Sequence, residues 1–226
     1  MSGAIARDTG VIIFAKPPVR GEVKTRLASD IGPDRAAALA RAFLEDTWSF
    51  VRGLSWADAV LATTSVGLFD VRDLDRKQVW LQGEGDVGQR IESMLQRALK
   101  QWARAIALGA DTPGLPLRLL EQAREGLRTT DAVLGPTDDG GFYLIGLRRC
   151  PEGLLRNLPW SQEDTFATTF ARLERSGLTV TALERWFDVD RWEDLRRLRD
   201  LFEAGVVTAP ATQKVLHSFR TAEGAP

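Results

Sequence analysis

The stretch VIIFAKPPVRGEVKTRLA, residues 11–28, joins a short apolar run to a segment rich in positive charge. The run VIIFA is β-branched and uninterrupted, which is typical of a strand buried on both faces of a parallel sheet. The segment that follows carries Lys16, Arg20, Lys24 and Arg26. A basic loop that leaves a buried strand is placed to meet an anion. We therefore expect a sheet protein whose first strand ends at an anion-binding loop.

The rest of the chain alternates apolar strand patterns with amphipathic helix patterns. Strands are expected at 11–15, 59–64, 78–82, 105–110, 131–135 and 142–147. Helices are expected from Pro33, over 87–102 and 117–127, around Phe166 to Leu173, and around Trp192 to Phe202. Such alternation predicts an α/β fold, a three-layer α/β/α sandwich with a mainly parallel sheet.

Length and composition indicate one domain. The chain has 226 residues, of which 44% are hydrophobic, enough for one large core. We expect a single domain over residues 1–226, with a core at about 11–205. The tail from about 209 to 226 is expected to be loosely held.

The charge balance excludes several classes of protein. Lys and Arg number 30 against 31 Asp and Glu, so no overall field attracts nucleic acid or a membrane. Cys150 is the only cysteine and His217 the only histidine, which excludes an intrachain disulfide and a cysteine metal cluster. No apolar stretch is long enough for a signal peptide or a bilayer span. We expect a cytoplasmic protein without nucleic-acid or membrane partners.

Ligands of open α/β sheets bind beyond the carboxyl ends of the strands, so residues that directly follow a strand are informative. In the opening loop, Gly21 allows close backbone approach, and Lys24 and Arg26 can pair with phosphate oxygens. The predicted nucleotide-binding residues are Lys16, Arg20, Gly21, Lys24, Thr25 and Arg26. The alternative is a solvated basic surface loop. The loop is not a P-loop, because the glycine and lysine spacing of that motif is missing.

Asp111 directly follows the predicted strand AIALGA and precedes Thr112 and Pro113. A carboxylate there can coordinate Mg²⁺ or Mn²⁺ together with nucleotide phosphates, because hard cations prefer oxygen ligands. Equally, Asp111 can cap the N-terminus of the next helix. The residues alone leave both interpretations open.

The segment GPTDDGGFYLIGL contains Asp138, Asp139, Gly140 and Gly141 between two apolar runs. Asp-Gly is a strong signal for a β-hairpin, so a purely structural turn is one interpretation. A tight turn needs only one such pair. The doubled acids and glycines favour a turn that also presents carboxylates to a ligand lying against the backbone.

The segment WFDVDRWEDLRRL places Asp188 and Asp190 two residues apart before a helix. One of them is expected to cap that helix, and the other can supply a second acid for the metal. Capping alone is the competing interpretation.

These motifs, in this order and together with Pro159–Trp160, resemble an uncharacterised bacterial family of GT-A-like nucleotide-diphospho-sugar transferases. Some of its members are described as arsenosugar-biosynthesis glycosyltransferases. The resemblance runs from about Val11 to Leu201 and implies a GT-A-like fold. More distantly, the layout is similar to phospholactate and molybdenum cofactor guanylyltransferases. In that wider group a basic loop holds nucleotide phosphates, and an Asp at the position of Asp111 holds the metal.

The chain departs from the family pattern at three places. Arg20 stands where many relatives have Pro, and Arg191 and Trp192 replace a Thr-Pro pair. Gly109 leaves Asp111 without the second acid of an Asp-x-Asp motif.

The resemblance and the residues together predict a metal-dependent transferase that uses a nucleotide-activated donor. We expect first a glycosyltransferase acting on a nucleotide sugar. A nucleotidyltransferase releasing pyrophosphate from a nucleoside triphosphate is the alternative, and a non-catalytic nucleotide-binding module the third possibility. An NAD-binding dehydrogenase is disfavoured, because the Gly-x-Gly-x-x-Gly fingerprint is missing after the first strand. The base, the transferred group, the acceptor and the oligomeric state stay open.

Each candidate residue receives a role in this scheme. Asp111, Asp139 and Lys24 are the predicted catalytic residues, and Asp111, Asp188 and Asp190 the predicted ligands of Mg²⁺ or Mn²⁺. A small-molecule acceptor is expected at Asp138, Asp139, Gly140, Gly141, Trp160 and Ser161. For Trp160, packing in the core is the competing interpretation.

Overall fold

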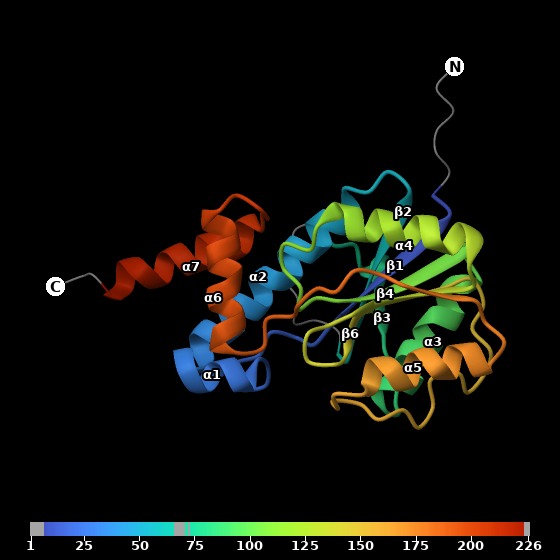
Figure 1. Ribbon diagram of the computed structural model, residues 1–226. Coiled ribbons are helices and arrows are strands. Elements are labelled where there is room, and N and C mark those ends of the chain that lie inside the picture. Colours follow the sequence, from blue (N-terminus) through green and yellow to red (C-terminus); the bar gives the residue numbers. More distant parts are fainter. Residues whose placement is uncertain (1–6, 66–70, 72, 224–226) are drawn as a thin grey trace, which may run out of the picture.

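A central sheet lies between two layers of helices in the computed structural model, which describes residues 7–65, 71 and 73–223 (Figure 1). The strands are β1 (Thr9–Ala15), β2 (Ala57–Thr63), β3 (Val79–Leu81), β4 (Arg104–Gly109), β5 (Ala132–Pro136), β6 (Phe142–Leu147) and β7 (Val180–Ala182). The helices are α1 (Thr25–Ile31), α2 (Pro33–Arg52), α3 (Val87–Leu99), α4 (Leu117–Thr129), α5 (Thr165–Arg175), α6 (Trp192–Glu203) and α7 (Pro210–Glu223), with a 3₁₀ turn, η1 (Arg76–Gln78).

The sheet is mainly parallel, as predicted. Within the described part of the chain its strand order is β3-β2-β1-β4-β6-β5-β7. Strand β1 pairs in parallel with β2 and β4, whereas β6 runs antiparallel to both of its neighbours, β4 and β5. The DAVLG and FYLIGL segments thus form the predicted hairpin, and β6 enters the sheet between β4 and β5.

Alternation along β1 explains the two layers of helices. Val11 and Ile13 pack in one core with side chains of α2 and α4, while Ile12 packs in a second core with α3 and α5. Successive side chains of a strand point to opposite faces, so an uninterrupted apolar run needs cover on both. Figure 1 shows α4 on one side of the sheet and α3 and α5 on the other.

A third apolar cluster joins α1, α2, α6 and α7 at one side of the sheet. The stretch from Ala209, for which the sequence predicts a loosely held tail, instead forms α7 as far as Glu223. Asp46 of α2 accepts hydrogen bonds from the backbone N–H groups of Ala211 and Thr212, which lie in the first turn of α7. These are donors that a helix leaves unpaired at its N-terminus, so α2 fixes where α7 begins.

No helix in the described ranges is long and apolar enough to cross a bilayer.

Candidate functional site

Two cavities open at the carboxyl ends of the central strands. The first, about 450 Å³, is lined by Lys16, Lys24, Thr25 and Arg26 of the basic loop. The second, about 430 Å³, is lined by residues of the β5–β6 hairpin and of the loop before α5. Arg26, Asp111 and Asp190 line both cavities, so the two share a wall. The arrangement suits two ligands that meet at this wall.

The basic loop turns sharply so that one lysine points inward. Lys24 directly precedes α1 and has a left-handed backbone conformation, φ 48° and ψ 42°, which is uncommon for a residue other than glycine. Leu27 of α1 is fully buried and anchors the helix. The Lys24 side chain is only 4% exposed, and its Nζ lies 2.8 Å from Asp111 Oδ1 and 2.6 Å from Asp190 Oδ1.

The ion cluster favours the charged forms of Lys24 and Asp190. Burial disfavours the Lys24 ammonium, but the two carboxylates outweigh burial and raise its pKa. Burial likewise disfavours the Asp190 carboxylate, but Lys24 outweighs it and lowers the pKa of Asp190. The cluster therefore stabilises the Lys24 ammonium and the Asp190 carboxylate against the cost of burial at the shared wall.

Asp111 does not cap a helix. Helix α4 begins at Leu117 with Pro116 as its N-cap residue, several residues beyond Asp111. The backbone oxygen of Asp111 accepts a hydrogen bond from the Val189 N–H at 2.9 Å. This bond fixes the end of β4 against the segment that carries Asp188 and Asp190, so acids far apart in the sequence meet at one place.

Neither Asp188 nor Asp190 caps α6, contrary to the sequence-based interpretation. Helix α6 begins at Trp192, and Asp194 reaches back to accept hydrogen bonds from the backbone N–H groups of Asp190 and Arg191, at 3.0 and 2.8 Å. The N-cap residue of α6 is Arg191, so neither Asp188 nor Asp190 uses its carboxylate for capping. Both line the second cavity.

Burial raises the pKa of Asp188 to about 7, and repulsion from Asp190 and Asp139 adds to the effect. The second cavity thus gathers Asp111, Asp139, Asp188 and Asp190, with Arg26 as the positively charged lining residue. Such a lining disfavours an anionic ligand and suits a ligand that donates hydrogen bonds.

The hairpin fixes Asp139 in one orientation. Asp139 Oδ1 accepts hydrogen bonds from Thr137 Oγ1 at 2.5 Å and from the Gly141 N–H at 3.0 Å. Gly140 has φ 87°, and a Cβ there would lie 2.0 Å from the backbone oxygen of Glu163, so glycine is required for this close approach. The second carboxylate oxygen of Asp139 has no hydrogen-bond partner within the described ranges, which leaves it free for a ligand.

Aromatic residues form another side of the second cavity. Trp160 packs against the core next to Phe142, with ring centroids 5.8 Å apart in an edge-to-face arrangement. Trp160, Phe142, Tyr143 and Ser161 all line the cavity. Trp160 is therefore both a core-packing residue and a cavity residue, and the two interpretations of it are compatible.

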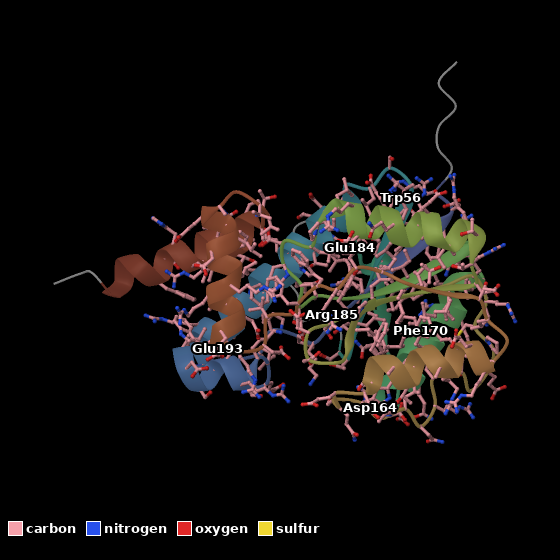
Figure 2. The ribbon with its side chains drawn as sticks, viewed as in Figure 1. Trp56, Asp164, Phe170, Glu184, Arg185 and Glu193 are labelled. Carbon is pink, nitrogen blue, oxygen red and sulfur yellow. The ribbon has the colours of Figure 1, made fainter. Side chains whose placement is uncertain are left out.

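Four predicted site residues line neither cavity. The Arg20 Nε pairs with the exposed carboxylate of Asp34 at 2.7 Å, and Gly21 lies in the same turn. Asp138 pairs with Arg197 Nη1 of α6 at 2.5 Å, while Arg185, beside the hairpin in Figure 2, donates to the backbone oxygen of Thr137. Gly140 lies in the turn of the hairpin, packed against the backbone of Glu163.

Among the residues of the first cavity that sequence reasoning missed are Gln82 and Arg90. The Gln82 side chain is buried and donates to the backbone oxygen of Ala62 at 2.9 Å, and Arg90 Nε is buried without a hydrogen-bond partner among the described residues. The segment QGEGDVGQR directly follows β3. The rule that ligands bind beyond strand ends would have identified it.

The acids fit a divalent cation that arrives with a phosphate ligand. Among the residues that the structure describes, no group of three or more acids, histidines or cysteines is close enough to hold a metal alone. Asp111 and Asp190 nevertheless bring one carboxylate oxygen each to a common cation, at present the Lys24 ammonium. Mg²⁺ is commonly held by one or two carboxylates together with substrate phosphates and water, which matches this set.

The sequence model of a bacterial family described as "Uncharacterized protein conserved in bacteria (DUF2064)" matches residues 52–162. No curated protein sequence matches the chain. The structure is similar to that of a presumed nucleotide-diphospho-sugar transferase from Desulfovibrio desulfuricans G20. The TM-score is 0.82 at 28% identity, over 95% of this chain and 96% of that one.

Two more distant structures share the fold alone. CMP:2-keto-3-deoxy-manno-octonic acid synthetase, complexed with CTP, has a TM-score of 0.54 and 14% identity, over 88% of this chain and 99% of that one. 4-Diphosphocytidyl-2C-methyl-D-erythritol synthase from Anaerococcus prevotii DSM 20548 also has a TM-score of 0.54, at 12% identity, over 87% of this chain and 99% of that one. The resemblance and the fold class that the sequence predicts are thereby confirmed.

Proposed function

We propose that this protein is a transferase that uses a nucleotide-activated donor, with the donor phosphates in the first cavity and the acceptor in the second. The observation that carries the proposal is the cluster of Lys24, Asp111 and Asp190 at the wall between the cavities. A reacting bond placed there would face cations on one side and carboxylates on the other.

The basic loop supplies the electrostatics for the donor. Lys16, Lys24 and Arg26 would bind phosphate oxygens and neutralise the charge that develops on the leaving group. Asp111 and Asp190 would hold Mg²⁺ or Mn²⁺, which would supply further neutralisation of the phosphates. Chemistry of this kind depends on positioning and charge, so it needs no histidine or cysteine nucleophile.

The second cavity fits an acceptor rich in hydroxyl groups. Carboxylate oxygens of Asp139 and Asp188 can accept hydrogen bonds from hydroxyls and can take a proton from an attacking one. Trp160 and Phe142 offer apolar surface to the carbon skeleton of such a molecule.

Glycosyl transfer from a nucleotide sugar is our first assignment, supported by the likeness to the presumed nucleotide-diphospho-sugar transferase. Nucleotidyl transfer is the second candidate. Of the two distant structures, one is a synthetase complexed with CTP and the other is named as a 4-diphosphocytidyl synthase. Their fold, which this chain shares, supports nucleotidyl transfer as the second candidate. In the first reaction the cations would hold a departing nucleoside diphosphate, in the second a departing pyrophosphate.

The deciding experiment measures product release with Mn²⁺ present. The purified chain is incubated with a panel of nucleotide sugars and, separately, with nucleoside triphosphates. We expect slow release of nucleoside diphosphate from at least one nucleotide sugar, abolished in Asp111→Asn and retained in Asp200→Asn, a matched change at an exposed position of α6. Pyrophosphate release from a triphosphate, with every nucleotide sugar intact, would favour nucleotidyl transfer. Nucleotide binding without either product would favour the non-catalytic module.

A further inference from the structure

The Lys24 ammonium lies where a divalent cation held by Asp111 and Asp190 would have to lie. Its Nζ is within hydrogen-bond distance of one oxygen from each carboxylate, at 2.8 and 2.6 Å. A metal ion bound to the same two oxygens would approach them to about 2.1 Å, which would bring it against the ammonium. Two cations at such a separation repel strongly, so the ammonium and the metal compete for one place.

Lys24 is built into this position by the fold. Its backbone oxygen accepts the Ala28 N–H at 2.7 Å, which starts α1, and its ammonium lies 5.8 Å from the centre of the Phe43 ring. The Asp111 side chain is 54% exposed and that of Asp190 37%, so both acids are far more open to solvent than the lysine, which is 4% exposed. A lysine so deeply buried needs an anionic partner at all times.

Two other cations of the first cavity differ from Lys24. Neither Lys16 nor Arg26 forms a salt bridge with an acid in the described part of the chain, although both line the cavity. They can bind incoming phosphates without giving up a partner. Lys24 already directs two of its three N–H donors to Asp111 and Asp190, so a phosphate in the first cavity has to compete with these carboxylates for the ammonium.

We propose that Lys24 is a positioning residue that couples binding of a divalent cation to binding of the donor. Without donor, the ammonium holds Asp111 and Asp190 together and keeps the metal out. When donor phosphates fill the first cavity, they offer the ammonium a new anion, and both carboxylates become free for a metal that arrives with the phosphates. The inference rests on the proposed function, because it takes the first cavity as the phosphate site.

The test measures two affinities of the donor-free protein by calorimetry. One titration uses Mn²⁺ alone, and the other uses inorganic pyrophosphate in metal-free buffer. Lys24→Met should bind Mn²⁺ about tenfold or more tightly than the wild type, since couplings between sites commonly have this size. The same variant should bind pyrophosphate more weakly. A merely structural lysine would change both affinities in the same direction.

Lys16→Met is the matched control, since it removes the same charge from the same cavity without touching the acids. It should weaken pyrophosphate binding and leave the Mn²⁺ affinity unchanged. If circular dichroism shows that Lys24→Met is unfolded, Lys24→Gln replaces it, because the glutamine amide is uncharged and can still donate hydrogen bonds to the carboxylates. Tighter Mn²⁺ binding and weaker pyrophosphate binding are expected for this variant too.

An Mn²⁺ affinity that is unchanged or lower in the Lys24 variant would overturn the coupling. Release of nucleoside diphosphate by the wild type would then still support the proposed function, so the two failures are distinguishable. Tighter Mn²⁺ binding in the variant, without product release by the wild type, would support the coupling and count against the reaction.

Discussion

Glu92 of α3 holds the segment that brings Trp160 to the second cavity. The Glu92 side chain is 5% exposed, and its two carboxylate oxygens accept the backbone N–H groups of Gly153 at 2.7 Å and Leu155 at 2.9 Å. One turn earlier, a Cβ at Gly88 would lie 2.1 Å from the Leu155 oxygen and 2.8 Å from the Trp160 ring. Helix α3 and this segment therefore fit closely, and Glu92 is the group that joins them.

We predict that Glu92→Ala lowers the free energy of unfolding by about 3 kcal/mol. Each hydrogen bond to a charged group is worth roughly 1.5 to 3 kcal/mol, and the two bonds share one side chain, so their sum is an upper bound. For a chain of this length, such a loss lowers the melting temperature by roughly 6 to 12 °C. Glu92→Gln keeps one acceptor oxygen, so its free energy of unfolding should lie between those of Glu92→Ala and the wild type.

The assay combines thermal unfolding with ligand binding. Pyrophosphate affinity should be unchanged in Glu92→Gln, because Trp160 at the end of this segment lines the second cavity and no residue of 153–160 lines the first. Acceptor-dependent turnover should fall, since Trp160 loses its support. Glu121→Ala on the exposed face of α4 is the control and should unfold like the wild type. A Glu92→Ala variant that melts with the wild type would refute the reasoning, because the two buried N–H groups would then need no acceptor.

Three further changes test the site and the fold. Arg26→Ala should weaken pyrophosphate binding about tenfold or more without altering the melting temperature, and unchanged affinity by calorimetry would remove Arg26 from the phosphate site. Asp111→Asn should abolish Mn²⁺-dependent nucleotide binding in the thermal-shift assay while costing about 1 kcal/mol of stability or less, because Asp190 still pairs with Lys24 and the Asp111 side chain is half exposed. Strong destabilisation with retained Mn²⁺ binding would contradict that role. Hydrogen bonds from the Thr179 N–H and the Arg149 side chain lower the pKa of Asp131 from 3.8 to about 2. The Asp131 carboxylate therefore stabilises the fold above about pH 4, and this contribution is lost as the pH falls towards 2. The melting-temperature difference between the wild type and Asp131→Asn should therefore shrink over that range, and a constant difference would exclude the linkage.

The fold class could be predicted from the sequence because burial requires apolar residues at regular spacings in strands and helices. Val11, Ile12 and Ile13 form a continuous apolar run, and only a strand covered on both faces buries all three. Alternation with amphipathic helices then indicates a mainly parallel sheet. Because ligands of such sheets bind beyond the carboxyl ends of the strands, Asp111 and the basic loop could also be predicted to lie at the ligand-binding edge of that sheet. These inferences use residues close together in the chain.

Pairings between distant residues appear only in the folded chain. Lys24 meets Asp190, 166 positions away, and no local pattern states which acid a lysine will contact. The capping alternatives for Asp111, Asp188 and Asp190 were equally strong in the sequence, because Asp serves both as a cap and as a ligand. They separate once α4 begins at Leu117 and Arg191 is the N-cap residue of α6. Local patterns report burial and turn chemistry, whereas the partner of a charged side chain depends on how the strands and helices pack, and packing brings these acids to one lysine.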